Sequence, residues 1–471
     1  MLFLAQFTMV HSNPNRRDFL KTVSTAGAAA LALGASLRAG AAAAPATPRR
    51  KGRSAVGLVA PKLDVVRWGV IGLGARGSGT LREAMLLEHC EICGLCDNHA
   101  PTLARAVAAV QKTGRPDPAV FGDGDEAYKK MLERADIDAV FICSPWRWHV
   151  PMAVAAMRAG KHAFVEVPAA VTLEECWQLV DTAEETQRHC MMMENCCYGR
   201  EELMLLRLCR EGVLGELLHG EASYLHDLRS QTKQVDHGTG SWRIREHELR
   251  DGNLYPTHGL GPVAQYLNIN RGDRFARLVS FGSPSLGLPD YVEKNFPAGH
   301  PRRTARYVCG DLNTSLVKTA RGRTIVVQHD TTNPRPYSRS NLIQGTRGLF
   351  AGYPSRIYVE GRTATEEWET DLTKWFEEFD HPLWKKVAGV AAKLPKDGTS
   401  GHGGMDFVMR WRIVQCLREG LPLDQSVYDA AAWSAISPLS EQSVAQGGAP
   451  IEVPDFTRGA WEKTAPLGIV A

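Results

Sequence analysis

The stretch Val65–Gly77, VVRWGVIGLGARG, decides the fold of the first half of the chain. Its β-branched run Val65–Ile71 predicts a buried strand, and a helical pattern continues from the glycine-rich turn to about Leu87. Asp97 follows 20 residues after Gly77, at the end of a second predicted strand. A G-x-G-x-x-G turn between a strand and a helix, with an acidic residue about 20 residues further on, is typical of a dinucleotide-binding βαβ unit.

The chemistry of this turn predicts NAD as the cofactor. Gly72, Gly74 and Gly77 let the backbone turn tightly and approach a pyrophosphate, which binds at the N-terminus of the following helix. Asp97 is placed to accept hydrogen bonds from the adenosine ribose, and its negative charge would repel the 2′-phosphate of NADP. Arg76 lies in the same loop, from which it could contact a phosphate.

The rest of the chain extends this unit into two domains. Alternating strand and helix patterns over residues 63–197 predict an α/β domain with a doubly wound parallel sheet, the Rossmann fold. Residues 198–471 have more strand candidates with less helix between them, which predicts an α+β domain with an open, mostly antiparallel sheet. Helical patterns at Asp406–Glu419 and Ser426–Ser434 are expected to close this second domain, which would bind the substrate.

The first 45 residues have the order of a secretory signal: basic, then apolar, then small. The paired arginines of Asn15–Lys21 precede a mildly apolar stretch, and Ala41–Pro45 has the character of a cleavage site. This order is similar to a Tat leader, so we expect the Tat machinery to export the folded protein to the periplasm or the exterior. Residues 46–62 are expected to form a linker, and no other segment predicts a membrane anchor.

Composition excludes several classes of partner. The formal charge is +3, with 55 Lys and Arg against 52 Asp and Glu, and residues 1–46 carry four of the basic residues and one of the acidic ones. The remaining chain is therefore balanced, which argues against a nucleic-acid partner. Cys93-x-x-Cys96 has no second pair at zinc-binding spacing, so no metal site is expected, and most of the eleven cysteines are expected to be buried thiols.

Glu166-Val167-Pro168 follows a later predicted strand and resembles the glucose–fructose oxidoreductase superfamily, in which a Rossmann domain precedes an open-sheet domain. Dehydrogenases of that superfamily typically carry Glu-Lys-Pro here, with the lysine as the acid/base group. Val167 replaces this lysine, which argues against alcohol oxidation by the usual residues.

The second half narrows the resemblance to glycoside hydrolase family 109, the NAD-dependent α-N-acetylgalactosaminidases. The likeness runs from about Val66 to about Val453 and is carried by Tyr224–Arg229, Trp242-Arg243, Gly252–Pro262 and Gly401–Asp406. It implies NAD contacts at Ala75, Arg76, Asp97, Trp146, Arg147, Trp148, His149, Glu166, Val167 and Asn195. It implies contacts to a glycan or glycoside substrate at Tyr224, Arg243, Tyr255, Pro256, Thr257, His258 and Tyr337.

Nothing in the sequence identifies the carboxylate pair that most glycosidases use. The resemblance implies hydrolysis by transient oxidation instead: NAD⁺ takes a hydride from C3, the C2 proton and the C1 oxygen are eliminated, water adds at C1, and the hydride returns. Tyr255 and His258 are three residues apart and could share one face of a helical turn, where they would do the acid/base work. Which of the two is the acid and which is the base stays open.

Two other functions remain compatible with the sequence. An NAD-dependent sugar dehydrogenase would release NADH at each turnover, and a non-catalytic sugar-binding protein would turn nothing over even with NAD⁺ supplied. The open sheet of the second domain also predicts a homodimer, because an open sheet often pairs with its own copy.

Overall fold

The structure is a computed structural model that describes residues 48–391 and 401–469. The chain divides into two units, residues 1–46 and 47–471, and the second unit is considered below. The expected Tat leader in residues 1–45 lies outside the described residues. Residues 48–62, expected as a linker, pack along the body, where the backbone N–H of Arg53 donates to the Glu184 carbonyl and that of Ala55 to the Tyr428 hydroxyl.

The first half forms a six-stranded sheet in the order β3-β2-β1-β4-β5-β6, in which all neighbours are parallel. Trp68 stacks on Phe141 at 3.9 Å between ring centroids inside its apolar core. This order confirms the predicted doubly wound sheet. The strands are β1 (Val66–Ile71), β2 (Cys90–Cys96), β3 (Ala119–Phe121), β4 (Ala139–Ile142), β5 (His162–Val165) and β6 (Cys190–Met192), and the helices are α2 (Ala75–Leu86), α3 (Ala100–Gln111), α4 (Ala127–Leu132), α5 (Trp146–Arg158) and α6 (Leu173–Thr186).

The second half forms an eight-stranded sheet in the order β13-β12-β11-β7-β10-β9-β8-β14. Only the pair β7 and β10 is parallel, so the prediction of an open, mostly antiparallel sheet is confirmed. The strands are β7 (Leu217–Leu225), β8 (Phe275–Gly282), β9 (Asn313–Thr319), β10 (Thr324–Asp330), β11 (Leu342–Gly345), β12 (Gly348–Ala351), β13 (Arg356–Val359) and β14 (Ile451–Glu452).

Helices fill the space beside and between the sheets. The sequence predicts α14, α15 and a helical turn at Tyr255–His258, where α9 begins, but not the other helices between β7 and α14. In the described residues, the α-helices and the 3-10 helices (η) that follow β6 are η1 (Asn195–Tyr198), α7 (Arg200–Arg210), η2 (Arg229–Lys233), α8 (Thr239–Leu249), α9 (Thr257–Tyr266), α10 (Gly287–Asn295), α11 (Pro301–Thr304), α12 (Thr373–Phe379), α13 (Pro382–Ala391), η3 (Gly401–Gly404), α14 (Met405–Glu419), α15 (Val427–Ala445) and η4 (Ala460–Glu462).

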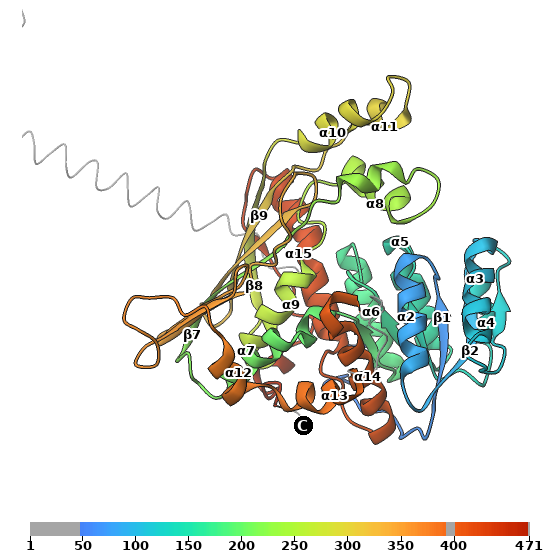
Figure 1. Ribbon diagram of the computed structural model, residues 1–471, viewed down its shortest axis with the longest axis horizontal. Helices are drawn as coiled ribbons and strands as arrows, with labels where there is room; N and C mark the ends of the chain where they lie inside the picture. The colour runs from blue at the N-terminus through green and yellow to red at the C-terminus, as the bar shows by residue number, and fades with distance from the viewer. Residues whose placement is uncertain (1–47, 392–400, 470–471) are drawn as a thin grey trace, which may run out of the picture. The chain divides into compact units, whose positions relative to one another are not determined.

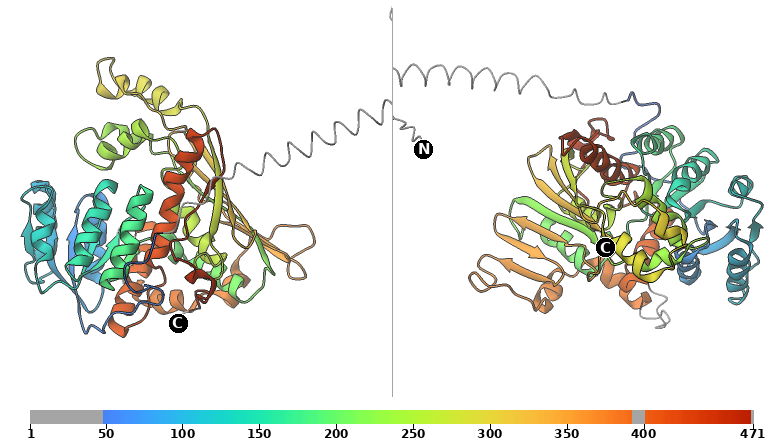
Figure 2. Two further views of the ribbon diagram at one scale, coloured as in Figure 1. Left: turned by 180° about the vertical axis from the view of Figure 1, so that it is seen from behind. Right: turned by 90° about the horizontal axis from the view of Figure 1, so that it is seen from above.

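Helix α15 joins the two halves. It packs on α6 on one side and on β8 on the other, and Figures 1 and 2 show it running between the parallel sheet and the long open sheet. Ser426 and Asp429 form a capping box that fixes where this helix begins. None of the described helices combines the length and the apolar character that crossing a membrane would need.

Helix α9 lies directly on β7 because glycine stands at the contact. A Cβ at Gly259 would lie 2.2 Å from the backbone nitrogen of Ser223, so no larger residue fits without moving the helix. This close approach holds the residues at the start of α9, including His258, against the sheet and beside the end of β6. The packing of one glycine thus positions the candidate acid/base group.

Candidate active site

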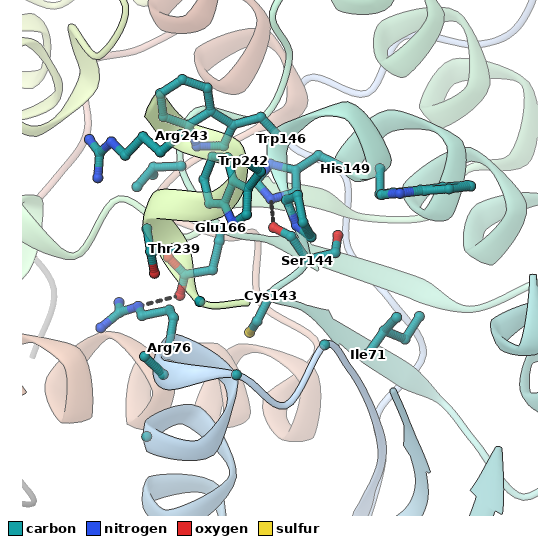
Figure 3. A pocket seen from close by; sticks show the side chains of 18 of the residues that line it. Ile71, Arg76, Cys143, Ser144, Trp146, His149, Glu166, Thr239, Trp242 and Arg243 are labelled. Carbon is teal, nitrogen blue, oxygen red and sulfur yellow. Dashed lines mark hydrogen bonds and ion pairs between the residues drawn. The ribbon is translucent and has the colours of Figure 1, made fainter. Parts of the chain in front are cut away.

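A cavity of about 670 Å³ lies at the carboxyl edge of the parallel sheet, between the two halves of the chain. Its walls come from the ends of β1, β2, β4 and β5, from β7 and α8, and from the start of α14. Carboxyl ends of parallel strands are where α/β folds bind their ligands, and the volume is in the usual range for a cofactor or small-molecule site. Figure 3 shows residues from both halves meeting here.

The glycine turn has the geometry that a pyrophosphate needs. Gly72 has φ +79°, which favours glycine, and a Cβ at Gly77 would stand 1.8 Å from the Gly72 carbonyl oxygen. Gly74 differs, because no atom lies within 4 Å of the place its Cβ would take, and it lines the cavity. Two glycines therefore close the turn, while the third leaves open space at the N-terminus of α2, as a dinucleotide site requires.

Asp97 lies beside this turn at the end of β2. Its carboxylate accepts hydrogen bonds from the backbone N–H groups of Leu73 at 2.6 Å and His99 at 2.8 Å. These bonds fix the carboxylate at the cavity wall, where its remaining lone pairs can accept from a ribose. The arrangement fits the role that the sequence predicts for this residue.

Arg76 links three elements across the cavity floor. Its Nε donates to Glu166 at 2.7 Å, and its two terminal nitrogens donate to Asp406 at 2.7 and 2.8 Å (Figure 3 shows the first pair). Burial acts to raise the pKa of Asp406, but the Arg76 guanidinium holds it well below its ordinary value. His402 also contacts Asp406, through Nδ1 at 2.8 Å. These contacts connect the start of α14 to the glycine turn at Gly72–Gly77, called the phosphate-binding turn below.

The segment that opens α5 lies between the cofactor turn and the second domain. Trp146 is buried and stacks on Tyr255 at 5.8 Å between centroids, with Trp242 edge-on at 5.2 Å. His149 places Nδ1 2.7 Å from the Pro168 carbonyl and Nε2 2.8 Å from the Ser144 carbonyl. His149 therefore braces the loops that follow β4 and β5, and Trp146 forms part of the wall.

Arg243, from α8, is enclosed by aromatic rings at the other end of the cavity. Its guanidinium carbon lies 4.6 Å from the Tyr255 ring centroid, 5.3 Å from that of Trp146 and 5.7 Å from that of Tyr224. One terminal nitrogen is buried and makes no hydrogen bond to any residue that the structure describes. Cation–π contacts stabilise the charge, but an unpaired buried donor is costly, so this nitrogen is suited to a polar group of a ligand.

His258 stands between a carboxylate and a tyrosine. Its Nδ1 lies 2.7 Å from Glu194 Oε1, and its Nε2 lies 3.3 Å from the Tyr255 hydroxyl. Burial alone would raise the pKa of Glu194, but the charge and hydrogen bond of His258 hold it below its ordinary value. Because an ionised carboxylate only accepts, His258 Nδ1 carries the hydrogen that points to Glu194, and Nε2 is the ring nitrogen that can accept a proton from the cavity.

The Tyr255 hydroxyl is a weaker acid than that of an ordinary tyrosine. Burial raises its pKa well above the ordinary value, and the neighbouring Tyr224 adds to this shift, while Arg243 opposes it. The hydroxyl therefore keeps its hydrogen at neutral pH and donates toward His258 Nε2. The sequence leaves the roles of these two residues open, and the geometry favours His258 as the proton acceptor.

Comparison with known proteins gives two adjoining matches. Residues 66–194 match the model of an oxidoreductase family with an NAD-binding Rossmann fold, and residues 198–463 match the C-terminal domain of glycosyl hydrolase 109. A glycosyl hydrolase family 109 protein of Shewanella sp. (strain W3-18-1) is 56% identical over 97% of this chain and 99% of its own length. The chain belongs to glycosyl hydrolase family 109. It is a glycoside hydrolase whose cofactor is NAD.

Two further comparisons with this family 109 chain concern a named relative and a solved structure. A protein of Shewanella oneidensis named alpha-N-acetylgalactosaminidase is 54% identical, over 97% of this chain and 99% of its own length. A levoglucosan dehydrogenase, solved in complex with NADH and L-sorbose, has the same fold with a TM-score of 0.64 and 20% identity, over 83% of this chain and all of its own. The second likeness shows the fold alone.

Most of the residues predicted for the site of this family 109 chain line the cavity, and five do not. Gly77 packs under the turn, Asn195 and Thr257 are buried behind the wall, Pro256 precedes α9, and Tyr337 lies at the rim, 6.1 Å from Tyr224 between ring centroids. The predicted residues that line it are Gly72, Gly74, Ala75, Arg76, Asp97, Trp146, Arg147, Trp148, His149, Glu166, Val167, Tyr224, Arg243, Tyr255 and His258.

The sequence places Glu194 at the carboxyl end of a predicted strand, where it would border the cofactor, but it assigns no chemical role to Glu194 or Asp406. Glu194 is 64 residues from His258, and Asp406 is 330 residues from Arg76, so no local spacing connects either pair. The one available signal for Glu194 is its place after a predicted strand, at the edge where ligands bind. The structure adds both carboxylates to the candidate site.

Glu194, Cys196 and His258 also bring three metal-ligand types within 4.8 Å of one another. The Cys196 sulfur, however, accepts a hydrogen bond from Arg339 at 2.8 Å, and burial raises the pKa of this thiol well above its ordinary value. A guanidinium at the sulfur supplies the positive charge that a metal ion would otherwise bring and would repel that ion. The cluster is better described as a hydrogen-bonded support for His258.

Proposed function

We propose that this protein hydrolyses terminal α-linked N-acetylgalactosamine and keeps its cofactor through each turnover. One observation carries the proposal: the glycine turn that would bind the pyrophosphate and the contacting residues His258 and Tyr255 face one cavity. The chain around this cavity is 54% identical to a protein named alpha-N-acetylgalactosaminidase. Val167 supports it further, because an apolar side chain lines the cavity where related dehydrogenases carry a catalytic lysine. Proton transfer then falls to His258, with Tyr255 as a hydrogen-bond donor beside it.

The cofactor and the residues divide the chemistry. When bound, NAD supplies a reversible acceptor for the hydride at sugar C3, which acidifies the hydrogen at C2. The turn at Gly72–Gly77 would hold the pyrophosphate, and Asp97 would hold the adenosine ribose. Arg243, stacked against three rings, would orient a polar group of the sugar through its unpaired nitrogen.

His258 moves the decisive proton. Its Nε2 takes the proton from C2, and the electron pair left behind forms the C1–C2 double bond as the bond from C1 to the aglycone oxygen breaks. Water supplies its hydroxyl group to C1 and a proton to the departing aglycone oxygen. The proton held on His258 exchanges with solvent before His258 protonates C2, so the residue ends each cycle unchanged. Tyr255 keeps its hydrogen, because its pKa is raised, and donates it in a hydrogen bond toward a sugar oxygen.

Replacing Glu194 with glutamine should slow hydrolysis by about 10- to 100-fold, because a neutral amide does not stabilise positive charge on His258 and its NH₂ group can face Nδ1, which moves the ring hydrogen to Nε2. Steady-state kinetics and thermal unfolding of the same preparation check this expectation. Glu184→Gln, at a buried carboxylate outside the cavity, is the control. A full rate in folded Glu194→Gln protein would show that the carboxylate has no part in the function of His258.

Replacing Arg243 with methionine should raise KM by about 10- to 100-fold, because one charge-assisted hydrogen bond contributes about 1.5–3 kcal/mol. Methionine keeps much of the apolar contact with the rings but removes the donor. Steady-state kinetics with an aryl glycoside check this expectation. Arg321→Met is a matched control, since Arg321 also stacks on an aromatic ring, that of Trp461, outside the cavity. An unchanged KM would remove Arg243 from substrate binding.

A screen of aryl glycosides tests the function itself. The proposal expects release of p-nitrophenol from the α-linked N-acetylgalactosamine derivative, with NAD⁺ present and no accumulation of NADH. Steady production of NADH with free sugar would instead identify a sugar dehydrogenase. No turnover of any sugar with NAD⁺ supplied would identify a binding protein.

We also propose export and self-association. The paired arginines of Asn15–Lys21 support export of the folded protein by the Tat machinery to the periplasm or the exterior. The outer face of the eight-stranded sheet supports a homodimer, since Val279, Leu316 and Val326 lie side by side on neighbouring strands and Leu316 is 45% exposed.

A further inference from the structure

A second hollow, of about 560 Å³, lies in the second half of the chain beside the active-site cavity. Its walls come from the start of α7, the loop before β13 and the segment that leads into α14. Glu201, Glu202, Arg339, Tyr353, Trp384 and His402 are among its lining residues. None of these residues has a part in the chemistry described above.

The hollow adjoins the active-site cavity. His402 lines both spaces. A path of aromatic rings also connects them: Tyr224 at the active site lies 6.1 Å from Tyr337, and Tyr337 lies 5.9 Å from Tyr353. Tyr337 and Tyr353 are 37% and 38% exposed, so their faces are available to a ligand.

The lining suits a sugar ring. Tyr353 has φ +56°, a strained conformation for a residue with a side chain, and this conformation holds an exposed ring at the mouth. Arg339 lies 5.7 Å from the Tyr353 ring centroid, and its Nε is buried without a hydrogen bond to any residue that the structure describes. Aromatic faces beside a few fixed polar groups are what ligand sites for amphipathic molecules provide.

The charge of the hollow is balanced. Its ionisable carboxylates are Glu201 and Glu202, and its guanidinium groups are Arg200 and Arg339. Arg339 is paired with Glu202. An anionic sugar would need surplus positive charge here, so the lining favours a neutral sugar.

We propose that this hollow is the aglycone subsite, which binds the neutral hexose to which the terminal sugar is linked. The inference rests on the proposed function. It adds where the protein binds the aglycone, which is the part of the glycan on the other side of the cleaved bond. Binding there stabilises a disaccharide substrate and leaves a substrate without a second ring unaffected.

The test compares two substrates with the NAD-loaded enzyme: methyl α-N-acetylgalactosaminide, and a disaccharide in which the same sugar is α-linked to galactose. Released N-acetylgalactosamine is measured for both. Tyr353→Asn removes the ring while keeping a residue that tolerates positive φ, and Trp384→Leu changes another lining residue. Each variant should lose about tenfold in kcat/KM with the disaccharide, as expected for one aromatic contact, and little with the methyl glycoside. Trp368→Ala, at an exposed tryptophan outside both spaces, should change neither.

The ratio of the two rates separates the possible failures. If the unmodified enzyme cleaves neither substrate, the proposed function is wrong and this inference falls with it. If it cleaves both, and Tyr353→Asn and Trp384→Leu leave the ratio unchanged, the aglycone binds elsewhere. Thermal unfolding of each variant shows whether a loss of activity on both substrates comes from a loss of folded protein. The ratio of kcat/KM for the two substrates, measured on the folded fraction, still shows whether the hollow binds the second sugar.

Discussion

His258→Ala should lower kcat by about 10³-fold or more, the largest catalytic loss we expect from any single substitution in this chain. The reason is geometric. His258 Nε2 is the accepting nitrogen at the cavity, because Nδ1 faces the buried Glu194 carboxylate at 2.7 Å. Tyr255 cannot replace it as a base at neutral pH, since burial raises the pKa of that hydroxyl well above its ordinary value.

Three measurements on the same variant make the result specific. Release of p-nitrophenol gives the rate, the dinucleotide content of the purified protein shows whether the cofactor still binds, and thermal unfolding shows whether the fold is intact. The cofactor content should be unchanged, because His258 lies at the substrate end of the cavity. His219→Ala, at a histidine of β7 outside the cavity, is the matched control and should keep full activity. A His258→Ala enzyme that retains its rate would remove the proposed base.

Gly77→Ala should abolish NAD binding and destabilise the protein. A methyl group there would stand 1.8 Å from the Gly72 carbonyl oxygen, so the phosphate-binding turn must move. Overpacking of this kind costs about 1–3 kcal/mol, and more where backbone is the obstacle. The dinucleotide content of the purified protein should fall to background and the midpoint of thermal unfolding should drop.

Gly74→Ala separates the two effects. No protein atom lies within 4 Å of the place its Cβ would take, so the folded protein should keep its unfolding midpoint. The methyl group would enter the space left for the pyrophosphate, so affinity for NAD should fall by about tenfold or more. Native NAD content and stability in Gly77→Ala would mean that the turn is not the cofactor site.

The sequence anticipates those features that depend on local pattern. The strand, turn and helix around Gly72–Gly77 are predicted because the glycine spacing and the β-branched run before it are both local, and Asp97 follows for the same reason. The open sheet is also predicted, since its strands are short apolar runs bounded by turns. The prediction that Tyr255 and His258 share a helical turn is only partly right: α9 begins at Thr257, so Tyr255 precedes it, yet the two side chains still meet.

What the sequence could not provide is contact between distant residues. Glu194 reaches His258 only because glycine at 259 lets α9 lie close on β7, next to the end of β6. Asp406 reaches Arg76 only because α14 packs against α2. No periodicity in a single sequence encodes such pairings. The roles of the two carboxylates, and hence the choice of His258 as the base, depend on the folded chain.

The isotope content of the product tests the central claim most directly. Hydrolysis of the α-linked N-acetylgalactosamine derivative in D₂O, followed by NMR or mass analysis of the released sugar, reports whether the C2 hydrogen is exchanged during turnover. Elimination with His258 as the base predicts deuterium at C2 and no net NADH. Released sugar with its original hydrogen at C2, formed as fast by enzyme free of dinucleotide, would contradict the account.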